Sequence, residues 1–318
     1  MKKKYSIAKL HNFDLWKNFE NASPQSSIFS SVEFLENFID DLDLYSVSKG
    51  NEIKSLVYFF KKKKNILSEP LIYSGILFGP QQKQKNCRYL AEKFNLIDVI
   101  IEEILNKYTK IDFNLHYNVE DIRPFLWFNY NLPNKPKFSI DVRYTALIKL
   151  KSKSKEEIFE SFDDVKQRDI KKCDKNKEIS VDFKSNINLL KKFYEETMQQ
   201  NNGKFSRVNL DKMIKFMHQA SLNEKGFQTN VYFKSEPIYS IFFSIHNGVA
   251  CYLYGAGDIN FKDRLSGTYC LWRAIENCFK KKINYVDLEG INSPKRGSFK
   301  ITFGSFLKNY YNLKINNS

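Results

Sequence analysis

The sequence predicts an α/β (α+β) protein made of two similar units, each a mixed, mostly antiparallel sheet flanked by helices. Three observations predict it. Short β-favouring runs alternate with amphipathic helical segments along the 318 residues. Hairpin signals join several of these runs, and Asn247-Gly248 is the strongest of them. An ordered set of elements in the first half of the chain recurs in the second.

The first half contains elements of both kinds. Ser31 is a favourable N-cap for the helical segment that follows it. The turn Lys49-Gly50-Asn51 separates two β-favouring runs and predicts a hairpin. The expected elements are helices at 14–19, 32–39 and 90–105, and strands at 44–47, 53–60, 71–78 and 111–115.

The segment 129–140 carries Pro133 and Pro136 among Asn and Lys, and it is the expected domain boundary. The domains are therefore expected to be 1–135 and 136–318. Both faces of the strand at 238–245 are largely apolar, which predicts a central position in the second sheet. The expected elements after the boundary are strands at 144–150, 228–233, 238–245, 249–254 and 283–288, and helices at 155–172, 189–199, 210–220 and around 271–275.

The two halves share an order of elements. A hairpin, a further strand, an amphipathic helix and a short strand occur in each half, and the short strands contain 113–115 and 286–288 respectively. One such coincidence would carry no weight, but the ordered set indicates a duplicated unit. Only the second half continues into the segment 297–304, so the active half is expected to be the second.

Four segments of the second half resemble one family. They are the run YLYGAG at 252–257, a helix that bears Trp272, the run DLEG at 287–290 and the run FKITFG at 299–304. Together they resemble FemA/FemB/FemX-type (FemAB-like) transferases and their relatives in the GNAT acyltransferase superfamily. The resemblance implies tandem GNAT-like domains, with 1–135 a degenerate copy and 136–318 carrying the active groove. It also implies transfer of an acyl or aminoacyl group.

Lys300 is the first candidate catalytic residue. The resemblance implies that this lysine, with Phe299 before it, meets the acceptor end of an aminoacyl-tRNA. A cation can stabilise the oxyanion of an ester under attack by an amine, and an aromatic ring can stack on a base. The alternative is a surface lysine beside a core phenylalanine. An exposed lysine contributes little to folding, so Lys300→Ala is expected to leave the melting temperature nearly unchanged.

Asp287 is the second candidate catalytic residue, because a carboxylate at a strand end can orient an amine or accept its proton. Its alternative role is structural, as an acceptor for loop amides before Gly290. Glu289 is a weaker candidate base. Tyr252 and Tyr254 alternate along one strand, so they are expected to share a face and line a substrate groove, or to form a core pair.

Two arginines are candidate anion-binding residues. Arg264 begins the run RLSGTY at 264–269, which lies where a GNAT pyrophosphate loop would precede its helix, or which is an ordinary entry to that helix. The bulk of Tyr269 at the last position argues against acetyl-CoA. Arg207 follows a polar loop and is within reach of an anionic donor or acceptor, or is an ordinary surface residue. Glycines 255 and 257 either allow close approach of a ligand or end the strand.

A segment in the first half bears on the acceptor. The run QSSIF at 25–29 resembles an early segment of the Fem enzymes of wall synthesis, but no lysine follows it. In those enzymes a basic residue there holds the phosphate of the precursor. A wall-precursor acceptor is therefore less well supported than a nucleotide-sugar or surface-polysaccharide amine.

Composition excludes several classes of function. Lys+Arg total 51 against 36 Asp+Glu, a net charge of +15, which attracts polyanions or an acidic membrane surface, although the surplus can also be purely compositional. The 4 His show no metal spacing and the 5 Cys form no CxxC pair, so no metal is expected. No run reaches the length of a membrane span, and the expected localisation is cytoplasmic.

The expected function is transfer of an aminoacyl or acyl group to an amine of a peptidoglycan, nucleotide-sugar or surface-polysaccharide precursor. The donor, aminoacyl-tRNA or acyl-CoA, is a co-substrate, and no cofactor is expected. One alternative is an acyl-CoA-dependent N-acyltransferase acting on a sugar amine. The other is a GNAT-pair binding protein without catalysis. Convergence of Lys300 and Asp287 on one solvent-accessible cleft would favour an enzyme.

Overall fold

The computed structural model describes residues 5–80, 83–200, 206–261 and 265–316. Contacts divide the chain into two compact units. Unit 1 comprises residues 1–143 and 309–318, and unit 2 comprises residues 144–308. Each unit has a sheet flanked by helices, and the mixed, mostly antiparallel α/β architecture predicted from the sequence is confirmed.

The sheet of unit 1 has the strand order β1-β2-β3-β4-β6-β13, and β5 pairs with β3 outside this path. Its strand pairs are antiparallel, except for β4 with β6. The elements are β1 (Ser6–Lys9), α1 (Phe13–Ala22), η1 (Ile28–Ser30), α2 (Val32–Leu35), η2 (Glu36–Asp41), β2 (Leu42–Lys49), β3 (Glu52–Lys62), β4 (Asn65–Leu67), β5 (Gly75–Phe78), α3 (Asn86–Lys107), β6 (Lys110–Asn114), α4 (Arg123–Trp127) and the end of β13 (Phe306–Asn316).

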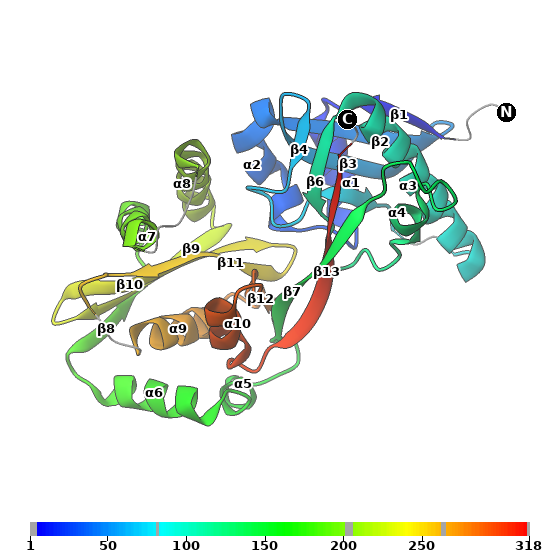
Figure 1. Cartoon of the computed structure of the whole chain (residues 1–318). Coiled ribbons are helices and arrows are strands. Elements are labelled where there is room, and N and C mark those ends of the chain that lie inside the picture. The colour runs from blue at the N-terminus through cyan, green and yellow to red at the C-terminus, as the bar shows by residue number, and fades with distance from the viewer. Residues whose placement is uncertain (1–4, 81–82, 201–205, 262–264, 317–318) are drawn as a thin grey trace. The chain divides into compact units, whose positions relative to one another are not determined.

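The sheet of unit 2 has the order β7-β12-β11-β10-β9-β8. Helices α7 and α8 cover one face, and α9 and α10 cover the other (Figure 1). The elements are the end of β7 (Ser139–Lys149), α5 (Lys155–Glu160), α6 (Asp164–Lys175), β8 (Ile179–Asp182), α7 (Ile187–Gln200), α8 (Arg207–Leu222), β9 (Gly226–Phe233), β10 (Glu236–His246), β11 (Val249–Gly257), α9 (Ser266–Lys280), β12 (Tyr285–Asp287) and α10 (Pro294–Ile301).

The predicted repeat of elements is present. Unit 1 contains the hairpin β2–β3, then β5, α3 and β6, and unit 2 contains the hairpin β9–β10, then β11, α9 and β12. The third strand of each set pairs antiparallel with the second strand. The sequence therefore encodes two versions of one strand–helix arrangement.

Three boundaries differ from the sequence-based expectation. The expected second domain was 136–318, but 309–318 group with unit 1, because β13 pairs with β6. The stretch 155–172 was expected to be one helix, but it forms α5 and α6, because Asp163 accepts a hydrogen bond from the backbone N–H of Val165 and starts a new helix. The FKITFG run was not expected to be helical, yet its first three residues end α10, which begins at Pro294.

The core of unit 2 lies between the sheet and α9. The predicted apolar face of this helix is confirmed, since Leu271, Ile275 and Cys278 are fully buried. Strand β10 lies between β9 and β11, and both Phe242 and Phe243 are fully buried. The central position predicted for this strand is therefore confirmed.

Candidate functional site

The candidate site lies where two parallel strands of unit 2 separate. β11 and β12 pair only through residues 249–251 and 285–287. β12 then ends, while β11 continues to Gly257. A β-bulge interrupts the pairing of β11 with β10, because Phe242 pairs with Tyr254 and Phe243 pairs with Tyr252. The strand ends at this separation carry most of the polar residues singled out in the sequence.

Asp287 lies at the end of β12, and its side chain is buried. Its Oδ1 accepts a hydrogen bond from Thr145 Oγ1 at 2.5 Å and another from the backbone N–H of Glu289 at 2.8 Å. These are the contacts of a carboxylate that fixes a loop, which was the alternative reading of this residue.

Lys300 comes from α10, and it is only 7% exposed. Its Nζ donates a hydrogen bond to the backbone carbonyl of Glu289 at 3.1 Å and lies 4.7 Å from the centre of the Tyr252 ring. Burial lowers the pKa of the Lys300 ammonium, and the neighbouring carboxyls of Glu289 and Asp287 oppose this shift. The expectation of an exposed lysine was wrong, because α10 turns this side chain inward.

Asp287 and Lys300 therefore converge on one residue, Glu289. Asp287 binds its backbone N–H, and Lys300 binds its carbonyl oxygen. Glu289 has φ 55°, a left-handed conformation that it shares with eight other non-glycine residues of the described structure, so the angle alone does not mark a site. The two predicted catalytic side chains thus hold the main chain from which the Glu289 side chain projects.

The Glu289 side chain is half-buried and has a perturbed pKa. Burial raises the pKa of its carboxyl, the ammonium of Lys300 lowers it, and the carboxylate of Asp287 raises it further. A glutamate that titrates above its ordinary range is a candidate general base. In the sequence Glu289 ranked below Asp287, because the burial that raises its pKa cannot be inferred from a glutamate in a sequence.

Tyr252 and Tyr254 lie on opposite faces of the sheet, which corrects the expectation that they share one. Tyr252 packs in the core beside α9, and its ring lies 5.4 Å from that of Phe243. Tyr254 contacts Tyr194 of α7 at 4.8 Å. The bulge at Leu253 is the reason, since one inserted residue breaks the alternation of side chains along a strand.

The glycines after Tyr252 make room for the protein's own side chains. A Cβ at Gly255 would lie 1.9 Å from the hydroxyl oxygen of Tyr252, and one at Gly257 would lie 2.6 Å from the Tyr239 ring. The space at these glycines is therefore filled from within the chain. Of the two readings offered for them, strand ending is confirmed for Gly257, the last residue of β11, whereas Gly255 lies within the strand.

The FKITFG motif is explained largely by packing. Phe303 is fully buried against Phe162, with 5.1 Å between their rings. Gly304 has φ 63°, and a Cβ there would lie 2.1 Å from Ser161 Oγ. Phe299 packs against Phe303, and the ammonium of Lys166 lies 4.8 Å from the centre of the Phe299 ring. The Phe299 ring was predicted to stack on a base, and in this structure it contacts the ammonium of Lys166.

The structure describes one of the two candidate arginines. Arg264 lies outside the described residues. Arg207 is exposed at the start of α8, on the sheet face that carries Tyr254 (Figure 1). Tyr269 is buried, and its hydroxyl donates a hydrogen bond to Asp174 of α6 at 2.8 Å. The phenol of Tyr269 therefore points toward α6. The expectation against acetyl-CoA assumed that this side chain obstructs a pyrophosphate loop, and this contact does not support that assumption.

The QSSIF segment has a structural role in unit 1. Gln25 is buried, its Nε2 donates a hydrogen bond to the carbonyl of Asn118 at 3.1 Å, and its Oε1 accepts one from the N–H of Phe78 at 3.0 Å. Its side chain thus joins three separate segments of this unit. Hydrogen bonding within the unit is enough to explain why a buried glutamine occurs there.

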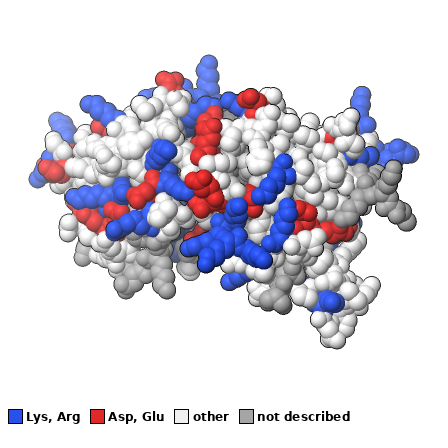
Figure 2. All heavy atoms as spheres, turned by 90° about the horizontal axis from the view of Figure 1, so that it is seen from above, with Lys and Arg blue, Asp and Glu red and all other residues white. Residues whose placement is uncertain are grey.

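Several classes of site are not found in the described part of the chain. Those residues contain no group of three side chains suited to hold a metal ion, and all five cysteines are free. None of their helices is both long enough and apolar enough to cross a bilayer. Lys and Arg side chains lie beside Asp and Glu side chains over much of the face seen in Figure 2.

Comparisons with known proteins agree with this arrangement. Residues 164–296, most of unit 2, match the family model described as an acetyltransferase (GNAT) domain. None of the curated proteins compared with the chain matches it significantly. Among solved structures, the chain is similar to FemX, with a TM-score of 0.65 and 13% identity over 96% of each chain.

Two further structures are similar over most of their length. One is a tandem GNAT protein from the clavulanic acid biosynthesis pathway, with a TM-score of 0.56 and 8% identity over 98% of each chain. The other is L-PGS from Bacillus licheniformis, with a TM-score of 0.53 and 10% identity over 88% of this chain and 89% of that one. Identities this low show the fold alone. The resemblance to FemAB-like GNAT proteins is confirmed at the level of the fold.

Proposed function

We propose that this chain, which has the tandem GNAT fold, transfers an acyl or aminoacyl group to an amine and uses Glu289 as the general base. The observation that carries the proposal is the clamp on Glu289. Asp287 and Lys300 bind its N–H and its carbonyl and hold it in a left-handed conformation at the point where β11 and β12 separate. Clefts at strand ends are where α/β proteins place their ligands.

The chemistry of an amine acceptor explains the need for such a base. The attacking nitrogen forms a bond to the carbonyl carbon, and the bond from that carbon to the sulfur or oxygen of the donor breaks. The nitrogen loses a proton to the Glu289 carboxylate, which returns it to the leaving thiolate or alkoxide. A carboxyl whose pKa is raised by burial is a stronger base than an ordinary glutamate.

The donor that these contacts support best is an acyl-CoA. Use of aminoacyl-tRNA rested on an exposed Lys300, a free Phe299 ring and an obstructing Tyr269. Lys300 is instead buried, Lys166 lies against the Phe299 ring, and the hydroxyl of Tyr269 is bonded to Asp174. Aminoacyl-tRNA is the second candidate donor, supported by the net charge of +15 and by the likeness to FemX.

We further propose an acceptor amine on a nucleotide-sugar or a surface-polysaccharide precursor, with a peptidoglycan precursor as a third option. The QSSIF segment, on which a phosphate-holding lysine was sought, is occupied by internal hydrogen bonds of Gln25. This leaves the wall-precursor acceptor with the least support of the three.

One observation favours a second function, that of a binding protein without catalysis. Asp287 is 3% exposed and Lys300 is 7% exposed, so neither side chain lies open to a substrate. On that reading the clamp on Glu289 only shapes a loop. The two functions differ in whether the carboxylate of Glu289 is needed for turnover.

The test supplies acyl-CoA and charged tRNA separately, each with a panel of amine acceptors, and follows the products by mass. We expect transfer by the wild-type chain and its loss in Glu289→Gln. The matched control is Glu224→Gln, since Glu224 is exposed and has the same left-handed backbone, with φ 55°. Transfer from neither donor, or equal transfer by Glu289→Gln and the wild type, would favour the binding protein.

A further inference from the structure

A group of exposed apolar side chains lies on unit 1, outside the site described above. Leu126, Trp127, Tyr130 and Leu132 form what we call the 126–132 patch, and their exposed fractions are 52%, 52%, 69% and 49%. Large apolar side chains scattered singly on a surface are ordinary, but four within seven residues indicate an interaction surface.

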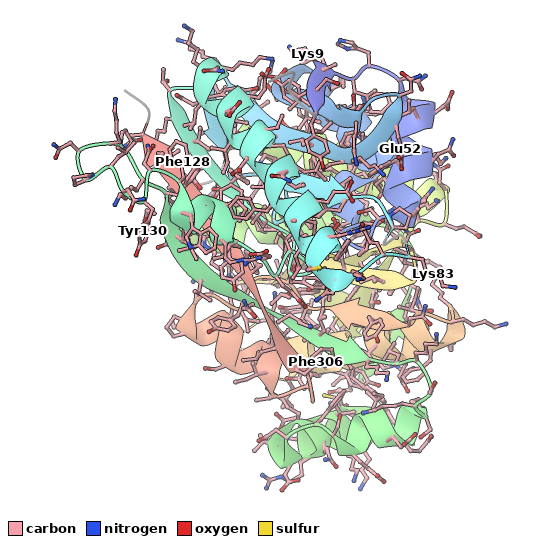
Figure 3. The ribbon with its side chains drawn as sticks, turned by 90° about the vertical axis from the view of Figure 1, so that its right-hand side faces the viewer. Lys9, Glu52, Lys83, Phe128, Tyr130 and Phe306 are labelled. Atoms are coloured by element: carbon pink, nitrogen blue, oxygen red, sulfur yellow. The ribbon has the colours of Figure 1, made fainter. Side chains whose placement is uncertain are left out.

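The segment that carries the patch is ordered and fixed from its inner side. Phe125 is buried, and its ring lies 5.2 Å from that of Phe138, which also contacts Phe128 at 5.7 Å. Figure 3 shows Phe128 and Tyr130 on the loop that follows α4, beside α3. The segment is therefore amphipathic, with phenylalanines toward the core and the patch toward solvent.

Hydrogen bonds hold the patch in shape. The backbone N–H of Tyr130 donates to the carbonyl of Trp127, and that of Leu132 donates to the carbonyl of Asn129, each at 3.0 Å. The side-chain amide of Asn129 donates to the carbonyl of Pro136 at 2.8 Å and closes the loop. A partner that binds these side chains would therefore not have to order the loop first.

The charges around the patch differ between its two ends: Arg123, before it, is paired with Asp121 at 2.6 Å, whereas the charged residues directly after it are lysines. Residues 122–140 contain Arg123, Lys135 and Lys137 and no Asp or Glu. Lys135 is exposed, and the ammonium of Lys137 donates a hydrogen bond to the carbonyl of Tyr130 at 3.4 Å. The Lys137 contact places positive charge beside the apolar side chains. The side of the patch that carries Lys135 and Lys137 is therefore complementary to an anionic partner.

We infer that the 126–132 patch docks unit 1 on the surface of an anionic lipid bilayer. Trp and Tyr favour the membrane interface, because their rings are apolar and each has a polar group. Leucines at the same surface insert among acyl chains, and lysines bind acidic headgroups. A single-stranded nucleic acid would stack on Trp127 and Tyr130 but would gain little from Leu126 and Leu132.

The chain contains its own reporter for this contact. Of its 3 Trp residues, Trp16 and Trp272 are buried, so Trp127 is the one that responds to a change of surroundings at the surface. Vesicles of phosphatidylcholine with phosphatidylglycerol should shift its emission to shorter wavelength, and bromine-labelled acyl chains should quench it. Vesicles of phosphatidylcholine alone should have a much weaker effect.

Two pairs of variants separate the apolar and the charged contributions. Leu126→Ser with Leu132→Ser should lower vesicle binding at least tenfold, whereas Leu222→Ser, at a leucine that is 84% exposed in unit 2, should not. Lys135→Gln with Lys137→Gln should lower binding by about fivefold per lysine. The matched control is Lys151→Gln with Lys153→Gln, two exposed lysines with the same spacing.

Three results would overturn the inference. The first is Trp127 emission that vesicles of either composition leave unchanged. The second is binding that the patch variants and their controls weaken equally. The third is a Trp127 response to single-stranded RNA that vesicles do not produce. All the substituted side chains are exposed, so an unchanged melting temperature should show that each variant is folded.

Discussion

Lys300 and Glu289 contact each other in this structure, and their contacts differ from those that the sequence predicts. Lys300 was the leading candidate for direct contact with substrate, yet its ammonium binds the backbone of Glu289 from a buried position. The pKa of the Glu289 carboxyl is raised by burial, which makes Glu289 a candidate base. At the scale of single residues, the sequence singled out Asp287, Glu289 and Lys300, and we propose that Glu289, the weaker candidate among them, carries the chemistry.

The stability of Lys300→Ala should differ from that of an exposed lysine variant in the same helix. Removing the Lys300 ammonium leaves the carbonyl of Glu289 without this donor, which should cost about 1–3 kcal/mol. Lys295→Ala, at an exposed position of α10, should change the free energy of unfolding by less than about 0.5 kcal/mol. Chemical denaturation measures both values, and equal midpoints would contradict the role given to Lys300.

Strands and helices were predicted well where hydrophobic periodicity is strong, as in α9 and β10. Prediction failed where a single local contact or inserted residue decides which way a side chain faces or where a helix ends. One inserted residue at Leu253 sends Tyr252 and Tyr254 to opposite faces, and one capping carboxylate at Asp163 divides a helix in two. Such local choices depend on packing partners far away in the sequence, which a single sequence does not reveal.

The central position of β10 gives a prediction at the scale of the element. Phe242 and Phe243 are fully buried on opposite faces of the sheet, so replacing either by alanine should create a cavity. Phe242→Ala and Phe243→Ala should each cost about 3–5 kcal/mol. Denaturant titration of the two variants tests this, and small losses in both would place β10 at an exposed edge instead.

The bulge in β11 gives a second prediction. Gly255→Ala should destabilise unit 2 by about 1–3 kcal/mol through overpacking, because the new Cβ would lie 1.9 Å from the Tyr252 hydroxyl oxygen. Tyr252→Phe removes that oxygen and should recover part of the loss, so the effects of the two substitutions should not add. Strict additivity in the double variant would mean that the two side chains do not meet.

At the scale of the whole molecule, the recurring order of elements predicted two units and the segment 129–140 predicted a boundary between them, but the return of the last strand was not predicted. The last strand, β13, returns to unit 1, and no local signal in 309–318 indicates that. The corresponding strand end of unit 1 has different residues from that of unit 2. Strand β6 of unit 1 corresponds to β12 of unit 2, and these strands end at Asn114 and Asp287 respectively. Two residues after these ends, unit 1 has His116 and unit 2 has Glu289.

His116 makes the stability of the chain depend on pH. Burial lowers its pKa from 6.5 to about 3. A depressed histidine pKa means that the unfolded chain takes up the proton first, so this stability is complete above pH 6.5 and is lost as the pH falls toward 3. His116→Gln should flatten the dependence of the unfolding midpoint on pH in that window. His218→Gln, at an exposed position, should not, and identical curves for the two variants would refute the assignment.

The pH dependence of kcat/KM for acyl transfer tests the central claim most directly, since that claim is a Glu289 base held by Asp287 and Lys300. The raised pKa of the carboxyl predicts that activity is lost as the pH falls through a value above the ordinary glutamate range. Lys300→Met removes a charge that lowers this pKa, so the acidic limb of the profile should move to higher pH. A limb that stays in the ordinary carboxyl range, unmoved by Lys300→Met and still present in Glu289→Gln, would contradict the account.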